Sequence, residues 1–267
     1  MRTTGDLEAA LGRLGRVVLG YSGGVDSAFL AVCGRRALGR DDFLAVIGTS
    51  ASYPAEQHAR ALALAARFDV PLLEVPTREL DDPHYAANPT DRCYFCKSEL
   101  WDRLGGVARE RGFETVIDGT NADDLGEHRP GLRAAGEAGI RSPLAEGGWT
   151  KDEVRAAARA LGIDNWDAPA APCLSSRVRY GLAITPERLA QVEQGETFLR
   201  RLGLRGDLRV RHLGATARIE TAPAELGHVE ARWEEVASFF AGLGFESVAL
   251  DPRGYRRGSL LVLDDPA

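Results

Sequence analysis

Short apolar runs alternate with helix-forming stretches over the first 170 or so residues of the chain. The runs have strand length and are apolar throughout, which is typical of strands buried on both faces of a parallel sheet. The stretches between them are long enough to form helices that cover such a sheet. We therefore predict an α/β fold, a parallel sheet with helices on both faces. The predicted strands are 17–19, 43–48, 71–75 and 115–119, and the predicted helices are 28–38, 55–68, 98–111 and 150–161.

The pattern changes after Pro172. Two adjacent strands, 208–212 and 217–220, precede a helix at 225–243 and a last strand at 247–251. A further helix, 186–202, begins with Thr185 as N-cap and Pro186 as its first residue. This order predicts a small α+β domain. We place the boundary near Gly181, which gives a larger α/β domain over 1–181 and a small α+β domain over 182–267.

Composition narrows the class of protein. The 267 residues are 44% hydrophobic and 27% charged, which is ordinary for a soluble globular protein. The net charge of −6 argues against nucleic acid as a partner, since a basic face is expected there. We find neither a secretory signal nor an apolar run long enough to cross a bilayer, and we expect a cytoplasmic protein without a membrane partner.

The segment after the first predicted strand has the features of a phosphate-binding loop. Glycines allow close approach of the backbone to a ligand, and the free N–H groups at the start of the next helix attract an anion. The lysine of Gly-x-x-x-x-Gly-Lys-[Ser/Thr] is missing, which favours a cradle for departing pyrophosphate over γ-phosphoryl transfer. Asp26 is the predicted Mg²⁺ ligand. An ordinary glycine-rich turn is the alternative. The predicted ATP-binding residues here are Ser22, Gly23, Gly24, Asp26 and Ser27.

Two other strand ends carry small polar residues. Thr49 follows the second predicted strand, and Gly119 and Asn121 follow the fourth. Ligands of parallel sheets bind at the carboxyl ends of the strands, so we expect these three residues to line the ATP site. An ordinary Asn/Asp turn at 119–124 is the alternative.

Three of the four cysteines suggest chemistry. Cys93 and Cys96 have the spacing of two thiolates that bind one metal ion or cluster, and Cys173 lies 77 residues after Cys96. A third thiolate would leave zinc, or one iron of a [4Fe–4S] cluster, without a protein ligand. The alternatives are structural zinc completed by a residue such as His84, and free or redox-active thiols. Cys33, within an apolar helix, is predicted to be a buried small hydrophobic residue.

Arginines are paired at three places in the second half of the chain. Arg209 and Arg211 share one face of a strand, since side chains alternate along it. The other pairs are Arg177 with Arg179 and Arg256 with Arg257. Guanidinium groups recognise carboxylate and phosphate, so together they predict an anionic substrate, whereas each pair alone is typical of a solvated surface. Glu196 and Glu220 are candidate metal or base residues.

The motifs together resemble those of a known family. The segment Ser22 to Ser27 resembles the signature of the ATP-pyrophosphatase (PP-loop) superfamily. The resemblance implies an ATP-pyrophosphatase domain over 1–181 and a substrate-binding or oligomerisation domain over 182–267. Over about residues 6 to 260 the chain resembles the LarE family of ATP-dependent sulfur transferases. The segments that point to this family rather than to the superfamily as a whole are 118–124, 129–131, 141–144, 171–177, 180–181, 209–212 and 217–220.

The resemblance implies a reaction. The family adenylates the carboxylates of pyridinium-3,5-biscarboxylic acid mononucleotide and replaces AMP by sulfur, in the biosynthesis of the nickel-pincer cofactor of lactate racemase. Cys173 matches the sulfur-bearing cysteine, which in single-cysteine members gives up its own sulfur. Cys93 and Cys96 add a likeness to the three-cysteine branch, in which a [4Fe–4S] cluster supplies replaceable sulfide.

The resemblance also assigns roles to charged residues. It implies substrate binding by Arg209, Arg211 and Arg256, to which Arg177 is added as a neighbour of Cys173. Glu220 is expected to be catalytic or metal-binding, and Glu196 a Mg²⁺ ligand. Leu261 departs from the polar residue expected near the end of the chain. A homo-oligomer is expected.

Two other functions remain open. A tRNA thiolase also combines this loop with cysteines, but it needs a basic surface or an RNA-binding module. The second alternative function is that of a nucleotide-sensing or structural zinc protein without turnover.

Overall fold

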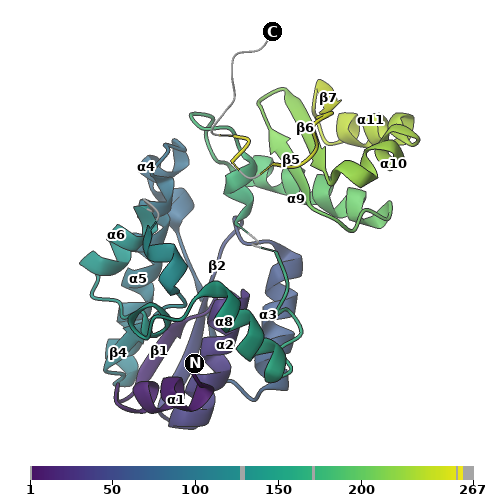
Figure 1. The fold of residues 1–267 in the computed structure, drawn as a ribbon. Coiled ribbons are helices and arrows are strands. Elements are labelled where there is room, and N and C mark those ends of the chain that lie inside the picture. Colours follow the sequence, from purple (N-terminus) through teal and green to yellow (C-terminus); the bar gives the residue numbers. More distant parts are fainter. Residues whose placement is uncertain (1, 127–129, 170–171, 257, 261–267) are drawn as a thin grey trace. The chain divides into compact units, whose positions relative to one another are not determined.

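The computed structural model divides the chain into two compact units (Figure 1). The first comprises Met1–Asp82 and Asp91–Ala171, and the second Pro83–Thr90 and Pro172–Ala267. The residues that the structure describes are 2–126, 130–169, 172–256 and 258–260. No helix among them is long and apolar enough to cross a membrane.

The first unit is built on a four-stranded parallel sheet, as predicted. Its strands β1 (Val17–Gly20), β2 (Phe43–Thr49), β3 (Leu72–Pro76) and β4 (Thr115–Ile117) have the order β3-β2-β1-β4. β1 is therefore a central strand, and the loop that leaves its last residue lies at the carboxyl edge of the sheet.

Helices cover both faces of this sheet, as alternate residues of β1 show. Val17 and Leu19 belong to an apolar cluster with residues of α1 (Thr4–Gly12), α2 (Val25–Leu38), α3 (Ala55–Arg67) and α8 (Lys151–Ala160). Val18 faces the other way, into a second cluster with residues of α5 (Arg92–Arg111) and α6 (Pro130–Glu137). A further short helix, α7 (Pro143–Glu146), also belongs to this unit. The α/β prediction is confirmed.

Two helices differ from their predicted extents. α5 begins at Arg92 rather than at Ser98, so that Cys93 and Cys96 lie in its first two turns. The predicted helix 225–243 is divided into α10 (Leu226–Glu230) and α11 (Trp233–Gly242). Thr150 caps α8 in a capping box with Glu153, as predicted.

The second unit has a three-stranded sheet with the order β5-β6-β7. β5 (Leu208–His212) and β6 (Thr216–Thr221) are antiparallel, and β7 (Ser247–Leu250) runs parallel to β6. One face of this sheet forms an apolar core with α9 (Pro186–Arg201) and α11, and includes Val210 and Ile219. The opposite face carries Arg209 and Arg211, as the alternation predicted.

The second unit begins earlier than Gly181 and includes a segment from the first half of the chain. This segment, 83–90, contains α4 (Pro83–Ala86). Tyr85 is buried, and its hydroxyl lies 2.6 Å from that of Ser175. The buried Asn88 donates from Nδ2 to the carbonyls of Val178, Arg179 and Leu182. These contacts place the change of unit at Pro172.

Candidate functional site

The predicted phosphate loop connects β1 to α2. Gly23 has a φ of +69°, and a Cβ there would lie 2.5 Å from that of Ala61, so both conformation and packing require glycine. Gly24 is the N-cap of α2 and has no side chain to occupy the first N–H groups of the helix. The hydroxyls of Ser22 and Ser27 lie 3.1 Å apart within the loop. This geometry leaves an anion-binding end on α2.

The segment after β4 lies beside this loop, as its place at a strand end predicted. A Cβ on Gly119 would come within 2.9 Å of the backbone nitrogen of Ser27. Asn121 donates from Nδ2 to Oδ1 of Asp26 at 3.3 Å. The buried Asp118 holds the turn by accepting hydrogen bonds from Thr120 N and from the hydroxyls of Thr120 and Ser142. The predicted ATP residues of these two segments are therefore neighbours.

Thr49 ends β2, at the same edge of the sheet. Its carbonyl accepts hydrogen bonds from the backbone N–H and the hydroxyl of Thr77, and its own hydroxyl is 3.5 Å from the carbonyl of Val75. These contacts join the ends of β2 and β3. The predicted contact of Thr49 with ATP stays a prediction.

A lysine that the sequence reasoning missed lies at the loop. Lys151, the first residue of α8, places Nζ 2.5 Å from Oδ2 of Asp26. Its backbone N–H donates to Asp123 at 2.8 Å, which joins α8 to the turn after β4. Thr150 indicated the start of the helix, but nothing in the sequence joins residues 26 and 151. Although the loop lacks a lysine of its own, the fold supplies one.

A second missed residue is Asn165, which lies beyond the end of α8. It donates from Nδ2 to the carbonyl of Gly23 at 2.7 Å. In addition, the Tyr53 hydroxyl and Gln57 Nε2 donate to the carbonyl of Ser22 at 2.9 and 3.0 Å. Side chains from three segments thus hold the loop backbone.

The cysteines differ in their surroundings. Cys93 is exposed and Cys96 half-buried, and their separation of three residues places both on one face of α5. Cys173 is half-buried and is the N-cap of the short 3-10 helix Leu174–Arg177. Cys33 is buried, as predicted, and burial raises the pKa of its thiol to about 12. Cys93, Cys96 and Cys173 are therefore all less enclosed than Cys33.

Cys93 and Cys96 have the donor type and spacing that suit a shared metal or cluster. Across the described ranges, however, no three His, Cys, Asp or Glu side chains gather as a metal-binding group. A third ligand from Cys173 stays a prediction from sequence. His84, the alternative fourth ligand for zinc, stays one as well.

Arginines and glutamates form a buried cluster in the second unit. Arg177 donates to both carboxylate oxygens of Glu196, at 3.0 and 3.2 Å, and to the carbonyls of Pro172 and Cys173, at 2.5 and 3.0 Å. The segment that carries the predicted sulfur-bearing cysteine is thus attached to this cluster. Glu196 Oε1 also accepts the backbone N–H of Val210 at 3.1 Å. Glu196, predicted to bind Mg²⁺, serves here as the partner of an arginine.

Glu220 occupies the centre of the same cluster. Its side chain has 0% exposure and accepts from Arg211 Nε and Arg218, each at 2.9 Å. The hydroxyl of Ser259 lies 2.9 Å from both carboxylate oxygens. Both oxygens are thus engaged, and the contacts show a counter-charge that orients arginines. The predicted catalytic role of Glu220 stays a prediction.

The cluster contains more positive than negative side chains. Arg209 lies with its guanidinium 5.0 Å from the centre of the Tyr255 ring. Burial, and next the charge of Arg177, lower the pKa of Arg209; burial also lowers the pKa of Arg211. A lowered arginine pKa means that the fold holds the cation at a cost, which an anionic ligand relieves. The cluster gathers four arginines around two glutamates: Arg177, Arg209, Arg211 and Arg218 with Glu196 and Glu220.

The remaining predicted arginines are not part of this buried cluster. Arg256 has a half-exposed side chain and lies 3.5 Å from the buried Asp251, which also pairs with Arg253. Arg179 is exposed on the loop after the 3-10 helix. Arg257, Leu261 and Arg129 lie outside the described residues.

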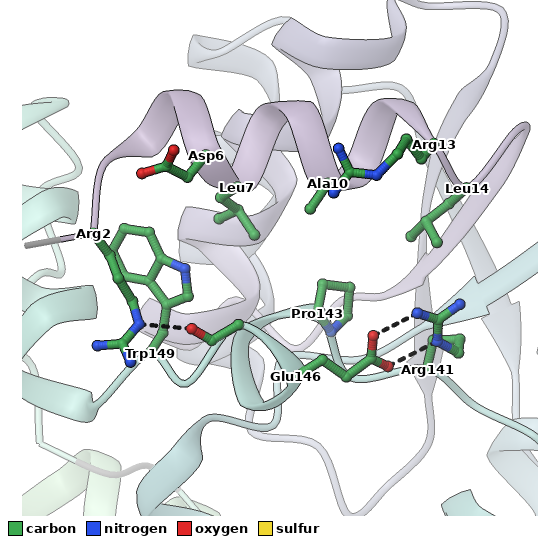
Figure 2. Close-up of a pocket in the computed structure, with 11 residues that line it drawn as sticks. Arg2, Asp6, Leu7, Ala10, Arg13, Leu14, Arg141, Pro143, Glu146 and Trp149 are labelled. Carbon is green, nitrogen blue, oxygen red and sulfur yellow. Dashed lines mark hydrogen bonds and ion pairs between the residues drawn. The ribbon is translucent and has the colours of Figure 1, made fainter.

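A pocket of about 440 Å³ lies elsewhere on the first unit, between α1 and the α7 region (Figure 2). Several of its polar residues pair with one another or with the backbone. Arg141 binds both oxygens of Glu146, at 2.8 and 2.5 Å, and Arg2 donates to the carbonyl of Gly147 at 2.6 Å. No predicted site residue lines this pocket, so it is not a candidate for the active site.

Comparison with known proteins identifies the family. Residues 10–92 match the family model described as NAD synthase. The chain is 43% identical over 257 residues to an uncharacterized protein of Synechocystis, covering 96% of this chain and 95% of the relative. It is 37% identical over 254 residues to the pyridinium-3,5-bisthiocarboxylic acid mononucleotide synthase of Lactiplantibacillus plantarum, covering 95% and 92%. An uncharacterized protein of Methanocaldococcus jannaschii is 30% identical over 242 residues, covering 90% and 91%.

These comparisons are consistent with the observed fold and with the assignment of the phosphate loop. The NAD synthase match spans β1, the phosphate loop and α2, which supports the use of ATP with Mg²⁺ by an enzyme. Two relatives exceed 35% identity over nearly the whole of both chains. The chain therefore belongs to the LarE family of ATP-dependent sulfur transferases.

Proposed function

We propose that this enzyme converts the carboxylates of a pyridinium dicarboxylate mononucleotide to thiocarboxylates, with ATP as the activating reagent. The relative from Lactiplantibacillus plantarum carries the name of the corresponding product, a bisthiocarboxylic acid mononucleotide. The observation that carries the proposal is the attachment of the Cys173 segment to a buried, cationic arginine cluster. Such a cluster suits a substrate that bears two carboxylates and a phosphate.

The first step is adenylation. A substrate carboxylate oxygen attacks the α-phosphorus of ATP, the bond to the β-phosphate oxygen breaks, and pyrophosphate leaves. The uncapped N–H groups at the start of α2 and the neighbouring hydroxyls of Ser22 and Ser27 support this loop as the site for the pyrophosphate. Asp26 fits Mg²⁺, which takes one or two carboxylates together with phosphate oxygens. When Asp26 binds the metal, Lys151 becomes available to the phosphates.

The second step replaces AMP by sulfur. A sulfur nucleophile attacks the acyl carbon, the bond between that carbon and the AMP oxygen breaks, and a thiocarboxylate derivative remains. If Cys173 attacks directly, a thioester forms. Loss of the α-proton with cleavage of the Cβ–S bond then releases the thiocarboxylate and leaves dehydroalanine. That route consumes the enzyme.

The sulfur is replaceable if it is not part of Cys173. Cys93, Cys96 and Cys173 would then be the ligands of a [4Fe–4S] cluster, and such a cluster would provide sulfur that can be replaced after each turnover. The placement of Cys93 and Cys96 on one helix face supports this assignment.

Isotope exchange tests the adenylation step. Labelled pyrophosphate is incubated with ATP, Mg²⁺ and the protein, with or without pyridinium-3,5-biscarboxylic acid mononucleotide. We expect label to enter ATP only when the dicarboxylate is present. Exchange that needs tRNA instead would favour a tRNA thiolase, and absence of exchange with every acceptor would favour a protein without turnover.

Metal analysis tests the cluster. Protein prepared without oxygen should contain about four irons per chain, and the Cys96→Ala variant should lose them. Cys33→Ala is the matched control, because Cys33 lies buried in the apolar core of the first unit and is not one of the proposed cluster ligands. This variant should keep its iron. Stoichiometric zinc without iron would contradict the cluster assignment.

A further inference from the structure

A buried carboxylate of the first unit has no place in the proposed reaction. Glu79 lies in the short 3-10 helix Glu79–Asp81 after β3, and only 2% of it is exposed. Oε1 accepts hydrogen bonds from the hydroxyls of Ser50, at 2.5 Å, and Ser52, at 2.9 Å. Oε2 is buried and has no hydrogen-bond partner among the described residues. Enclosing a carboxylate in this way is costly, and a residue kept at such a cost calls for a role.

Glu79 fixes the turn between β2 and α3. The hydroxyls of Ser50 and Ser52 lie 2.8 Å apart, and the Ser52 N–H donates to the Ser50 hydroxyl at 3.2 Å. The backbone N–H of the next residue, Tyr53, donates to the Ser50 carbonyl at 3.1 Å. One carboxylate oxygen thus gathers the turn from which the Tyr53 side chain projects.

Tyr53 in turn holds the phosphate loop. Its hydroxyl donates to the Ser22 carbonyl at 2.9 Å, and Gln57 donates to the same oxygen at 3.0 Å. In a trans peptide the carbonyl and the following N–H point in opposite directions. Holding the Ser22 carbonyl toward α3 therefore turns the Gly23 N–H away from α3. That N–H has no acceptor within the part of the chain that the structure describes.

We propose that Glu79 is a positioning residue for pyrophosphate: through Ser50, Ser52 and Tyr53 it orients the Gly23 N–H of the phosphate loop toward the ligand. The proposal rests on the ATP site assigned to this loop. It predicts an effect confined to ligands that carry a pyrophosphate group. A role in stability alone would weaken every ligand of the unit alike.

Calorimetric titration with Mg²⁺-ATP, Mg²⁺-pyrophosphate and AMP tests this assignment. Tyr53→Phe removes one hydroxyl and leaves the ring in place. We expect it to weaken ATP and pyrophosphate about fivefold and AMP by less than about twofold, the effect of one hydrogen bond. Glu79→Ala should weaken the first two ligands about tenfold or more. Glu79→Gln should restore affinity to within about threefold, because its amide oxygen keeps both serine donors.

The control is Glu74→Ala, an equal truncation of an exposed glutamate on β3 that pairs with His58, and it should bind as the wild type does. Should Glu79→Ala fail to fold, Tyr53→Phe decides the question. Wild-type affinity for ATP in Tyr53→Phe, or equal losses for ATP and AMP, would overturn the positioning role. Wild-type protein without affinity for ATP would instead refute the ATP site on which the proposal rests.

Discussion

Truncation of Glu220 probes the most enclosed charge of the second unit. The carboxylate has 0% exposure and is held at 2.9 Å by Arg211, Arg218 and Ser259. In Glu220→Ala the two guanidinium groups remain buried next to each other without their shared counter-charge. Removing one partner of a buried ion pair costs about 3–5 kcal/mol. Glu220→Gln keeps hydrogen-bonding atoms and should cost about 1–3 kcal/mol.

Hydrogen exchange measured by mass spectrometry reports this loss locally. Peptides that span β5 and β6 should exchange about a hundredfold to a few thousandfold faster in Glu220→Ala, since about 1.4 kcal/mol corresponds to a factor of ten. Peptides of β1 and β2 should exchange at unchanged rates. Glu246→Ala, an exposed glutamate before β7, is the control and should change stability by less than about 0.5 kcal/mol. A loss below about 1 kcal/mol in Glu220→Ala would refute the reasoning that this carboxylate is the counter-charge of the cluster.

Three further predictions concern other parts of the molecule. Lys151→Gln removes the cation beside Asp26 and should weaken Mg²⁺-ATP about tenfold in equilibrium titration, the effect of one charge-assisted hydrogen bond; unchanged affinity would contradict a role for Lys151 in phosphate binding. His212 Nδ1 accepts the Gly214 N–H while Nε2 faces Gln191, and burial, with a smaller effect of Arg188, lowers its pKa from 6.5 to about 4. The unfolded chain therefore takes up the proton first as the pH falls, so the stability of the wild type should drop by about 2 kcal/mol between pH 7 and pH 5, and His212→Gln should reduce that drop; equal pH profiles would contradict it. In metal-free folded protein a thiol reagent should modify Cys93, Cys96 and Cys173 but leave Cys33 unmodified until denaturant is added, and rapid reaction of Cys33 would contradict its burial.

The sequence was informative about the fold wherever local chemistry decides the structure. The apolar runs became parallel strands because a strand buried on both faces must be apolar throughout. Thr150 and Thr185 began helices because their side chains accept the N–H groups at the helix start. The early start of α5 had no such signal. Residues 92–97 are helical beside α6, where Arg133 lies 4.0 Å from the Tyr94 ring and Glu137 accepts the Tyr94 hydroxyl.

Some residues of the candidate site were likewise predictable from the sequence, and others were not. The loop from Ser22 to Ser27 and the turn at Gly119 to Asn121 were predictable, because the ends of parallel strands meet at one edge of the sheet. Lys151 and Asn165 were not, since they reach the loop from positions more than a hundred residues away. The partners of Glu196 and Glu220 were missed for a related reason. A sequence shows that a glutamate is present but not whether arginines have already engaged its carboxylate.

Product analysis under anaerobic conditions tests the central claim most directly. Protein, Mg²⁺-ATP and pyridinium-3,5-biscarboxylic acid mononucleotide are combined, and both the nucleotide product and the protein chain are weighed by mass spectrometry. We predict a product in which sulfur replaces a carboxylate oxygen, formed together with AMP and pyrophosphate. A chain of unchanged mass would assign the sulfur to the cluster, and loss of one H₂S from Cys173 would assign it to the cysteine. Cleavage of ATP to AMP without any sulfur in the product would contradict the account.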